Sequence, residues 1–214
     1  MKRDQVAWLY KALGERGLIE GSAGNVSART PDGMVITPSG GDPLATPASA
    51  LVDVRMDGTA PVGGTPSSEW AMHAAAYRVC PDAAFVVHTH ADACTALACL
   101  GEGLPAFHYM VLQFGGADVR CAAYVTFGTN ALAELAAEAL RDRTACLLAN
   151  HGMIVSAGSA KAAFNQAVLL ETLCRQYLLA RSAGTPRLLT AQDMADARDR
   201  FKTYGPRTSH APLS

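Results

Sequence analysis

The sequence is poor in charge and lacks the features that mark nucleic-acid-binding, membrane or secreted proteins. Charged residues make up only 17% of the 214 positions, no run of basic residues occurs, and the formal net charge is −1. A surface for nucleic acid or for an anionic membrane therefore has no electrostatic support. No segment approaches the roughly 18–20 unbroken apolar residues that cross a bilayer, and the N-terminus lacks the apolar block of a secretory signal. These absences predict a soluble, cytoplasmic protein with neither nucleic acid nor membrane as a partner.

Cysteine is present but follows no pattern. No Cys-x-x-Cys pair occurs, and the spacing matches neither a disulfide framework nor a cysteine zinc site. We therefore expect small core residues in a reducing compartment. The six are Cys80, Cys94, Cys99, Cys121, Cys146 and Cys174.

Half of the sequence is hydrophobic, which suffices for one compact domain, 1–214. Links of hairpin length outnumber crossover helices, so we expect an α/β fold with three α-β-α layers and a central, mostly antiparallel sheet. Residues from about 205 to 214 are expected to form a flexible tail. The periodicity of the apolar residues predicts helices near 3–19, 65–80, 90–101, 129–143, 160–180 and 190–202.

A pair of histidines ends one predicted strand. In FVVHTHADA, residues 85–93, His88 and His90 flank Thr89. Because residues i and i+2 of a strand project from the same face, the two imidazoles can converge on one point. Such a pair can bind zinc, which suits nitrogen ligands. Taken alone, the motif is also compatible with a hydrogen-bonding pair at a strand end.

A second apolar strand also runs into a histidine. In CLLANHGMIV, residues 146–155, His151 precedes a glycine that lets the backbone turn tightly. Two strands that end in histidines suggest three metal ligands at one edge of the sheet, with coordination positions left open for a substrate. Open positions are typical of catalytic metal sites rather than structural ones.

A third segment combines serine with an acid. In PSSEW, residues 66–70, Ser67 and Ser68 stand at a predicted helix start, where unpaired N–H groups favour an anion. The serines can then bind a phosphate, and Glu69 can act as a base beside the metal. The alternative is that one serine is simply the N-cap and Glu69 a first-turn acid.

Two further loops have a composition suited to an anion. GSAGNVS, residues 21–27, contributes the amide of Asn25, and TPSGG, residues 37–41, contributes Ser39 and Gly40. Turns of this kind occur in any fold, so neither loop is specific by itself.

Taken in order, the motifs resemble the class II aldolase/adducin family. The resemblance covers roughly residues 5–205, and the combination is specific where each single motif is not. It implies an enzyme that reversibly cleaves a ketose 1-phosphate to dihydroxyacetone phosphate and an aldehyde. The matching motifs are Gly24-Asn25, TPSG, SSE, HTH, PAFHYM, GG, YVTFGT, NHG and FKTYG.

The resemblance also implies a metal centre and a phosphate site. His88, His90 and His151 would bind Zn2+, or another divalent ion such as Co2+ or Mn2+. Glu69 would touch the metal until substrate displaces it. The implied phosphate-binding residues are Gly24, Asn25, Ser39, Gly40, Ser67 and Ser68.

Catalytic roles and assembly are implied in the same way. Glu69 would return a proton to carbon, while Tyr109 would reach across from a neighbouring subunit to handle the proton on the aldehyde oxygen. Tyr204 matches a second, mobile tyrosine. The family implies a fourfold-symmetric homotetramer with active sites between subunits.

Four alternatives to a metal-dependent aldolase make different demands on the sequence. A Schiff-base aldolase needs a buried lysine, but the four lysines lie near the termini or on polar helices. A pentulose-5-phosphate 4-epimerase carries aspartate where Glu69 stands, and a methylthioribulose-1-phosphate dehydratase shares the fold and the ligands. A metal-free adducin-like binding domain would lack the three histidines.

The sequence predicts the class of the substrate but leaves its identity open. L-fuculose 1-phosphate is one candidate. If the bulky Val111, Leu112 and Phe114 line the aldehyde end, the pocket would instead favour an apolar terminus, as in 5-deoxyribulose or 5-methylthioribulose 1-phosphate, handled in salvage metabolism. The alternative is that these three residues pack in the core or at a subunit interface.

Overall fold

A seven-stranded sheet organises the chain, in a computed structural model that describes residues 2–60 and 64–203. The strand order is β3-β2-β1-β4-β7-β6-β5, and each neighbouring pair is antiparallel except β5 with β6. The predicted α/β fold with a mostly antiparallel sheet is confirmed. The strands are β1 (Gly24–Arg29), β2 (Gly33–Ile36), β3 (Val52–Arg55), β4 (Phe85–Thr89), β5 (Arg120–Ala122), β6 (Ala145–Leu148) and β7 (Gly152–Ala157).

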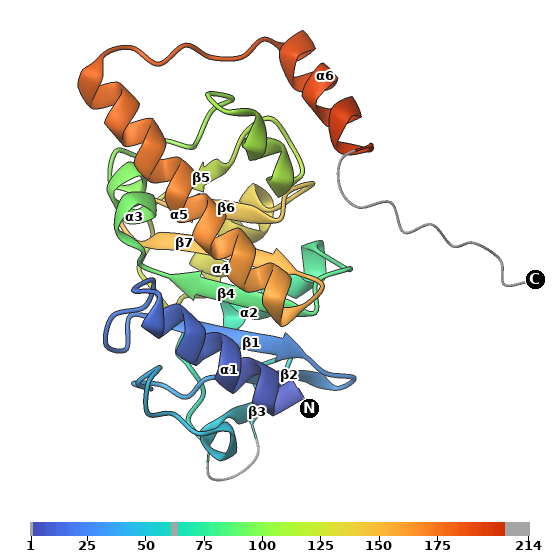
Figure 1. Ribbon diagram of the computed structural model, residues 1–214. Coiled ribbons are helices and arrows are strands. Elements are labelled where there is room, and N and C mark those ends of the chain that lie inside the picture. Colours follow the sequence, from blue (N-terminus) through green and yellow to red (C-terminus); the bar gives the residue numbers. More distant parts are fainter. Residues whose placement is uncertain (1, 61–63, 204–214) are drawn as a thin grey trace, which may run out of the picture.

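Helices cover both faces of the sheet, which gives the three expected layers (Figure 1). One face carries α1 (Lys2–Glu15), α3 (Asp92–Ala98), α5 (Ala160–Ala183) and the 3-10 helix η2 (Tyr109–Phe114). The other carries α2 (Trp70–Val79) and α4 (Asn130–Ala139). The short η1 (Ala48–Ala50) precedes β3, and α6 (Ala191–Phe201) packs beside η2. Among the helices of the described ranges, none combines the length and apolar character that a bilayer crossing needs.

Each face of the sheet has its own core because side chains alternate along a strand. Val87 of β4 packs in the core under α1 and α5, whereas its neighbour Val86 packs in the core under α2 and α4. The central strands are therefore buried on both sides, and their apolar runs show no alternation in the sequence.

The cysteines only partly follow the prediction. All six are free thiols, and Cys94, Cys146 and Cys174 are buried as expected. Cys99, however, is exposed, because it is the C-cap of α3, where the helix ends at the surface.

A buried carboxylate on α5 holds the beginning of α3. Both oxygens of Glu171 accept from the backbone N–H of Ala93, at 3.0 and 3.1 Å, and one accepts from Cys94 N at 3.0 Å. The first N–H groups of a helix have no partner inside it, so this side chain satisfies two of them. Since α3 begins two residues after His90, the contact also fixes the chain that leaves the predicted metal site.

Replacing Glu171 with alanine is expected to destabilise the protein by about 2–4 kcal/mol, because buried donors would lose a charged acceptor. Chemical denaturation monitored by circular dichroism measures the change. Thr172→Ala, on the exposed side of the same helix turn, serves as the control and should stay within about 0.5 kcal/mol of the original protein. Equal stability of the two variants would contradict this role for Glu171.

Candidate metal centre

The register of the sheet brings the predicted ligands to one edge. β4 is antiparallel to β7, with Thr89 opposite Met153, so the end of β4 lies beside the beginning of β7. His151 stands in the tight turn before β7 and therefore meets His88 and His90. A side chain at Gly152 would place its Cβ 2.4 Å from the carbonyl oxygen of Thr89. Glycine is therefore required for this close approach.

The three imidazoles surround one point. Their ligand nitrogens all lie within 4.8 Å of one another, and Nε2 of His88 is 3.1 Å from Nε2 of His90. The rings meet edge to face, with centroids 4.8 to 5.0 Å apart. His88 is fully buried, whereas His90 is exposed. The cluster thus opens on one side toward solvent, as a catalytic site requires.

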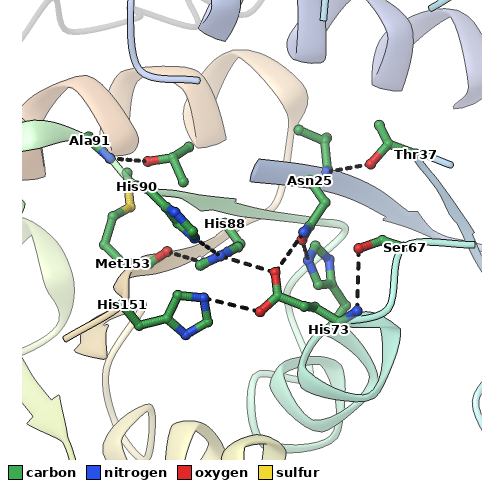
Figure 2. A network of polar contacts seen from close by, with 12 residues as sticks. Asn25, Thr37, Ser67, His73, His88, His90, Ala91, His151 and Met153 are labelled. Atoms are coloured by element: carbon green, nitrogen blue, oxygen red, sulfur yellow. Dashed lines mark hydrogen bonds and ion pairs between the residues drawn. The ribbon is translucent and has the colours of Figure 1, made fainter. Parts of the chain in front are cut away.

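A hydrogen bond fixes the tautomer of His88. Its Nδ1 lies 2.8 Å from the carbonyl oxygen of Met153, and a carbonyl can only accept, so Nδ1 carries the proton. In the neutral ring Nε2 then carries a lone pair, which points into the cluster (Figure 2). Histidines that bind metals usually donate their other N–H to a carbonyl or carboxylate in this way.

Glu69 places its carboxylate against the same cluster. It is the N-cap of α2 and is buried, with Oε2 3.2 Å from Nε2 of His88 and Oε1 3.2 Å from Nε2 of His151. Oε1 is buried without a hydrogen bond to any described residue. Electron-rich atoms that face one another at these distances need a cation or a proton between them. The donor set of three imidazoles and one carboxylate therefore fits a divalent transition metal.

Protonation is disfavoured within this group. The pKa of His90 is lowered to about 4, first by withdrawal from water and then by the neighbouring His88 and His151. Burial alone would raise the pKa of Glu69, but His151 and His88 outweigh it, and the net pKa lies well below the usual range. At neutral pH the site therefore offers an ionised carboxylate and a neutral His90 to a cation.

The start of α2 differs from the prediction. The helix begins at Trp70, so Ser67 and Ser68 lie in the turn before it and neither is the N-cap. The side-chain oxygen Oγ of Ser67 instead accepts a hydrogen bond from Glu69 N at 3.3 Å. Glu69 is the N-cap residue but its side chain makes no capping hydrogen bond to the helix, so its carboxylate is free to face the histidines.

The segments of the predicted phosphate site lie together. Ser39 N donates to Thr65 O at 3.0 Å and Ser67 N to Thr37 O at 3.1 Å, which pairs the 37–41 loop with residues 65–67. Gly40 has φ +69°, the left-handed region that favours glycine. Ser68 borders the loop before α4, since a Cβ on Gly128 would lie 3.4 Å from the Ser68 carbonyl oxygen.

β1 joins these loops to the metal centre. Asn25 lies opposite His88 in the β1–β4 register, and its amide donates to Oε2 of Glu69 at 2.9 Å. Gly24 precedes it, and a Cβ there would lie 2.9 Å from the carbonyl oxygen of His88. The structure therefore brings Asn25 and Ser67 to Glu69, while Gly24 allows the strands to approach.

The tyrosines stand apart from the cluster. Tyr109 begins η2, is 46% exposed, and stacks on His108 with centroids 4.7 Å apart. It also contacts Phe201 of α6, at 5.8 Å. Within the described ranges no contact joins Tyr109 to Glu69 or to the three histidines. Tyr204 and the tail, 205–214, lie outside the described residues.

The apolar residues after Tyr109 are mostly core. Val111 and Phe114 are fully buried under α5, and Leu112 packs against the same core while remaining partly exposed. Of the two alternatives, core packing therefore holds for Val111 and Phe114, because a 3-10 helix turns these positions inward.

A fourth histidine, His73, packs behind the site without joining the histidine cluster. It is fully buried on α2, and its Nε2 lies 2.5 Å from Oδ1 of Asn25. Its position four residues after Glu69, on the same helix face, was the available signal. The partner on β1 follows only from the tertiary structure.

Fold and site together define a class: an α/β protein with an open three-histidine centre beside a buried carboxylate at one sheet edge. The chain belongs to the class II aldolase and adducin family, whose model, described as Class II Aldolase and Adducin N-terminal domain, matches residues 4–178.

Individual relatives resemble most of the chain. A 5-methylthioribulose-1-phosphate/5-deoxyribulose-1-phosphate aldolase of Rhodospirillum rubrum is 45% identical over 189 residues, which cover 88% of this chain and 86% of the relative. An L-fuculose phosphate aldolase of Escherichia coli strain K12 is 43% identical over 190 residues, 88% of each protein. A solved structure of an L-fuculose 1-phosphate aldolase has a TM-score of 0.89 at 38% identity, covering 94% of this chain and 96% of its own.

Proposed function

We propose that the protein is a metal-dependent aldolase that reversibly cleaves a ketose 1-phosphate to dihydroxyacetone phosphate and an aldehyde. The observation that carries the proposal is the convergence of His88, His90 and His151 on a buried carboxylate, with their ligand nitrogens within 4.8 Å of one another. Family membership and two relatives named as sugar-phosphate aldolases support it.

The metal is proposed to be Zn2+, held by the three histidines. Two properties of the site support this choice: nitrogen ligands suit zinc, and the exposed His90 side leaves room for substrate oxygens. When bound, such an ion supplies a Lewis acid for the negative charge that develops on the substrate as the carbon–carbon bond breaks.

The proton transfers are proposed for Glu69 and Tyr109. In cleavage Tyr109 accepts the proton of the C4 hydroxyl as its own phenol proton passes to water, the C4 oxygen becomes the aldehyde oxygen, and the C3–C4 electron pair stays with the C1–C3 fragment. Glu69, which is ionised at rest, takes up one proton from water and delivers it to C3, which completes dihydroxyacetone phosphate, so that one proton leaves the site and one enters it. In the condensing direction Glu69, ionised because its pKa is lowered, takes that proton back.

Substrate phosphate is proposed to bind between the paired 37–41 and 65–68 segments. Backbone N–H groups in Gly- and Ser-rich turns favour anions, and Asn25 joins these segments to Glu69. The proposed contacts come from Gly24, Asn25, Ser39, Gly40, Ser67 and Ser68.

A homotetramer is proposed because Tyr109 stands apart from the metal centre of its own chain. Its 46% exposure leaves the ring available to an adjacent subunit. Tyr204 is proposed to act as the second tyrosine of the site, and the cytoplasmic location stays a prediction.

The decisive experiment measures dihydroxyacetone phosphate release from ketose 1-phosphates by a coupled assay. Treatment with a chelator should lower kcat by at least about 100-fold, since metal catalysis contributes several kcal/mol, and Zn2+ should restore it. Elemental analysis of the purified protein identifies the metal. Full activity after chelation and proven metal loss would refute the proposal.

The same assay settles the sugar. We propose 5-methylthioribulose or 5-deoxyribulose 1-phosphate as the preferred substrate, on the likeness to the Rhodospirillum rubrum aldolase, since core packing of Val111 and Phe114 removes most of the pocket argument. Values of kcat/KM for both are compared with that for L-fuculose 1-phosphate. A clear preference for L-fuculose 1-phosphate would overturn this choice but not the aldolase assignment.

A further inference from the structure

A buried chain of hydrogen bonds leads away from Glu69 into the layer between β1 and α2. Asn25 Nδ2 lies 2.9 Å from Glu69 Oε2, and Asn25 Oδ1 lies 2.5 Å from His73 Nε2. His73 Nδ1 is 2.7 Å from Ser27 Oγ, which is 2.8 Å from the hydroxyl of Tyr77. All five side chains are buried, none more than 8% exposed. Figure 2 shows Asn25 and His73 beside the histidine cluster.

The chemistry of the members gives the chain a direction. An ionised Glu69 can only accept, so Asn25 must turn its NH2 toward it and its oxygen toward His73. Nε2 of His73 must then donate, which leaves Nδ1 of the neutral ring to accept from Ser27. Ser27 in turn accepts from the phenol of Tyr77.

The protonation states of Tyr77 and His73 agree with this direction. Burial raises the pKa of Tyr77, so its phenol stays protonated and donates. Burial and the nearby His88 lower the pKa of His73 to about 3, so its ring stays neutral with a single N–H. The reversed chain would place the Asn25 oxygen against the Glu69 carboxylate, where two acceptors oppose each other.

We propose that His73 is a positioning residue for this site: its Nε2–H sets the amide of Asn25, and Asn25 thereby holds Glu69 in place for proton transfer. The inference deepens the proposed aldolase function and rests on it. An amide nitrogen carries two N–H bonds, so Asn25 can hold Glu69 with one and offer the other to the substrate phosphate. His73 thus sets the geometry of both ends of the site through one side chain.

Two substitutions separate this role from simple core packing. In His73→Gln the side-chain amide reaches the place of Nε2 and can still donate to Asn25. In His73→Asn the shorter side chain reaches only the place of Nδ1, so it can meet Ser27 but not Asn25. Both are polar, and both leave a smaller side chain in the same buried space.

The kinetic test compares these variants in the metal-loaded protein. His73→Asn should lower kcat by about 10–100-fold, the range typical of residues that orient a metal site, while His73→Gln should keep at least about ten times the kcat of His73→Asn. Metal content should match the original protein in both, since the three histidines are untouched. Equal kcat in the two variants, or an unaffected His73→Asn, would overturn the proposal.

A spectroscopic measurement keeps the test open if a variant fails to fold. Nitrogen chemical shifts of 15N-histidine in the zinc-loaded original protein report which ring nitrogen carries the proton. We expect His73 as the Nε2–H tautomer, and an Nδ1–H tautomer would overturn the proposal. If the original protein releases no dihydroxyacetone phosphate from any ketose 1-phosphate, the proposed function fails, whereas the tautomer result stands by itself.

Discussion

Replacing His151 with alanine is expected to lower kcat for ketose 1-phosphate cleavage by about 1,000-fold or more. The Lewis acid contributes several kcal/mol to the proposed reaction, and about 1.4 kcal/mol corresponds to a tenfold change in rate. His151 is also the ligand that comes from a different part of the chain, in the turn before β7. Its loss leaves only His88 and His90. Two protein ligands are too few for a site that must keep its metal while substrate binds.

The measurement combines kinetics with metal analysis. The His151→Ala protein should contain less than one Zn2+ per chain after dialysis, and excess Zn2+ should not restore kcat. Chelated original protein, treated in parallel, should recover when Zn2+ is added. Because His151 is only partly buried, we expect the variant to fold, which circular dichroism verifies. A variant that keeps both its zinc and its kcat would refute the assignment of His151 as a ligand of the catalytic metal.

The histidine cluster could be predicted because its parts follow local rules. Alternation along β4 places His88 and His90 on one side, and an apolar strand before NHG marks the turn that carries His151. That the two strands are neighbours, with Thr89 opposite Met153, is a property of the sheet order. Two strands that both end in histidines suggested one shared sheet edge, the resemblance to a family implied the same three ligands, and the structure places them together.

The hydrogen-bond chain behind Glu69 could not be predicted, for a physical reason. It needs the register of β1 against β4 and the rotation of α2 over β1, and neither leaves a local pattern. In the sequence His73 and Tyr77 look like ordinary positions on the buried face of an alanine-rich helix. The Met153 carbonyl that sets the tautomer of His88 is a backbone atom, to which residue identity gives no clue.

Val111 and Phe114 show a case in which the sequence left two alternatives open. Their place beside Tyr109 suggested a substrate pocket, but apolar residues look alike whether they line a pocket or fill a core. The geometry of η2 decides between these, since it buries both side chains completely while leaving Tyr109 exposed.

Replacing Glu69 with glutamine is expected to lower kcat by about 100- to 10,000-fold while the protein keeps its metal. The range is that of general acid–base catalysis, and the metal stays because the three histidines remain. Glutamine preserves the size of the side chain and an acceptor for Asn25, so the change removes the proton-transfer group and its negative charge while the shape of the site is kept. Glu138→Gln, at an exposed carboxylate paired with Arg141, is the control and should leave kcat unchanged.

Hydrogen exchange separates the role of Glu69 from that of Tyr109. Dihydroxyacetone phosphate incubated with the zinc-loaded protein in D2O should exchange one C3 hydrogen, a reaction that needs the proton transfer to carbon but no aldehyde. Glu69→Gln should abolish this exchange, whereas Tyr109→Phe should slow cleavage and leave the exchange intact, because Tyr109 handles only the aldehyde oxygen. Exchange that survives in Glu69→Gln would assign the proton on carbon to another group, and the buried carboxylate would then serve only the metal.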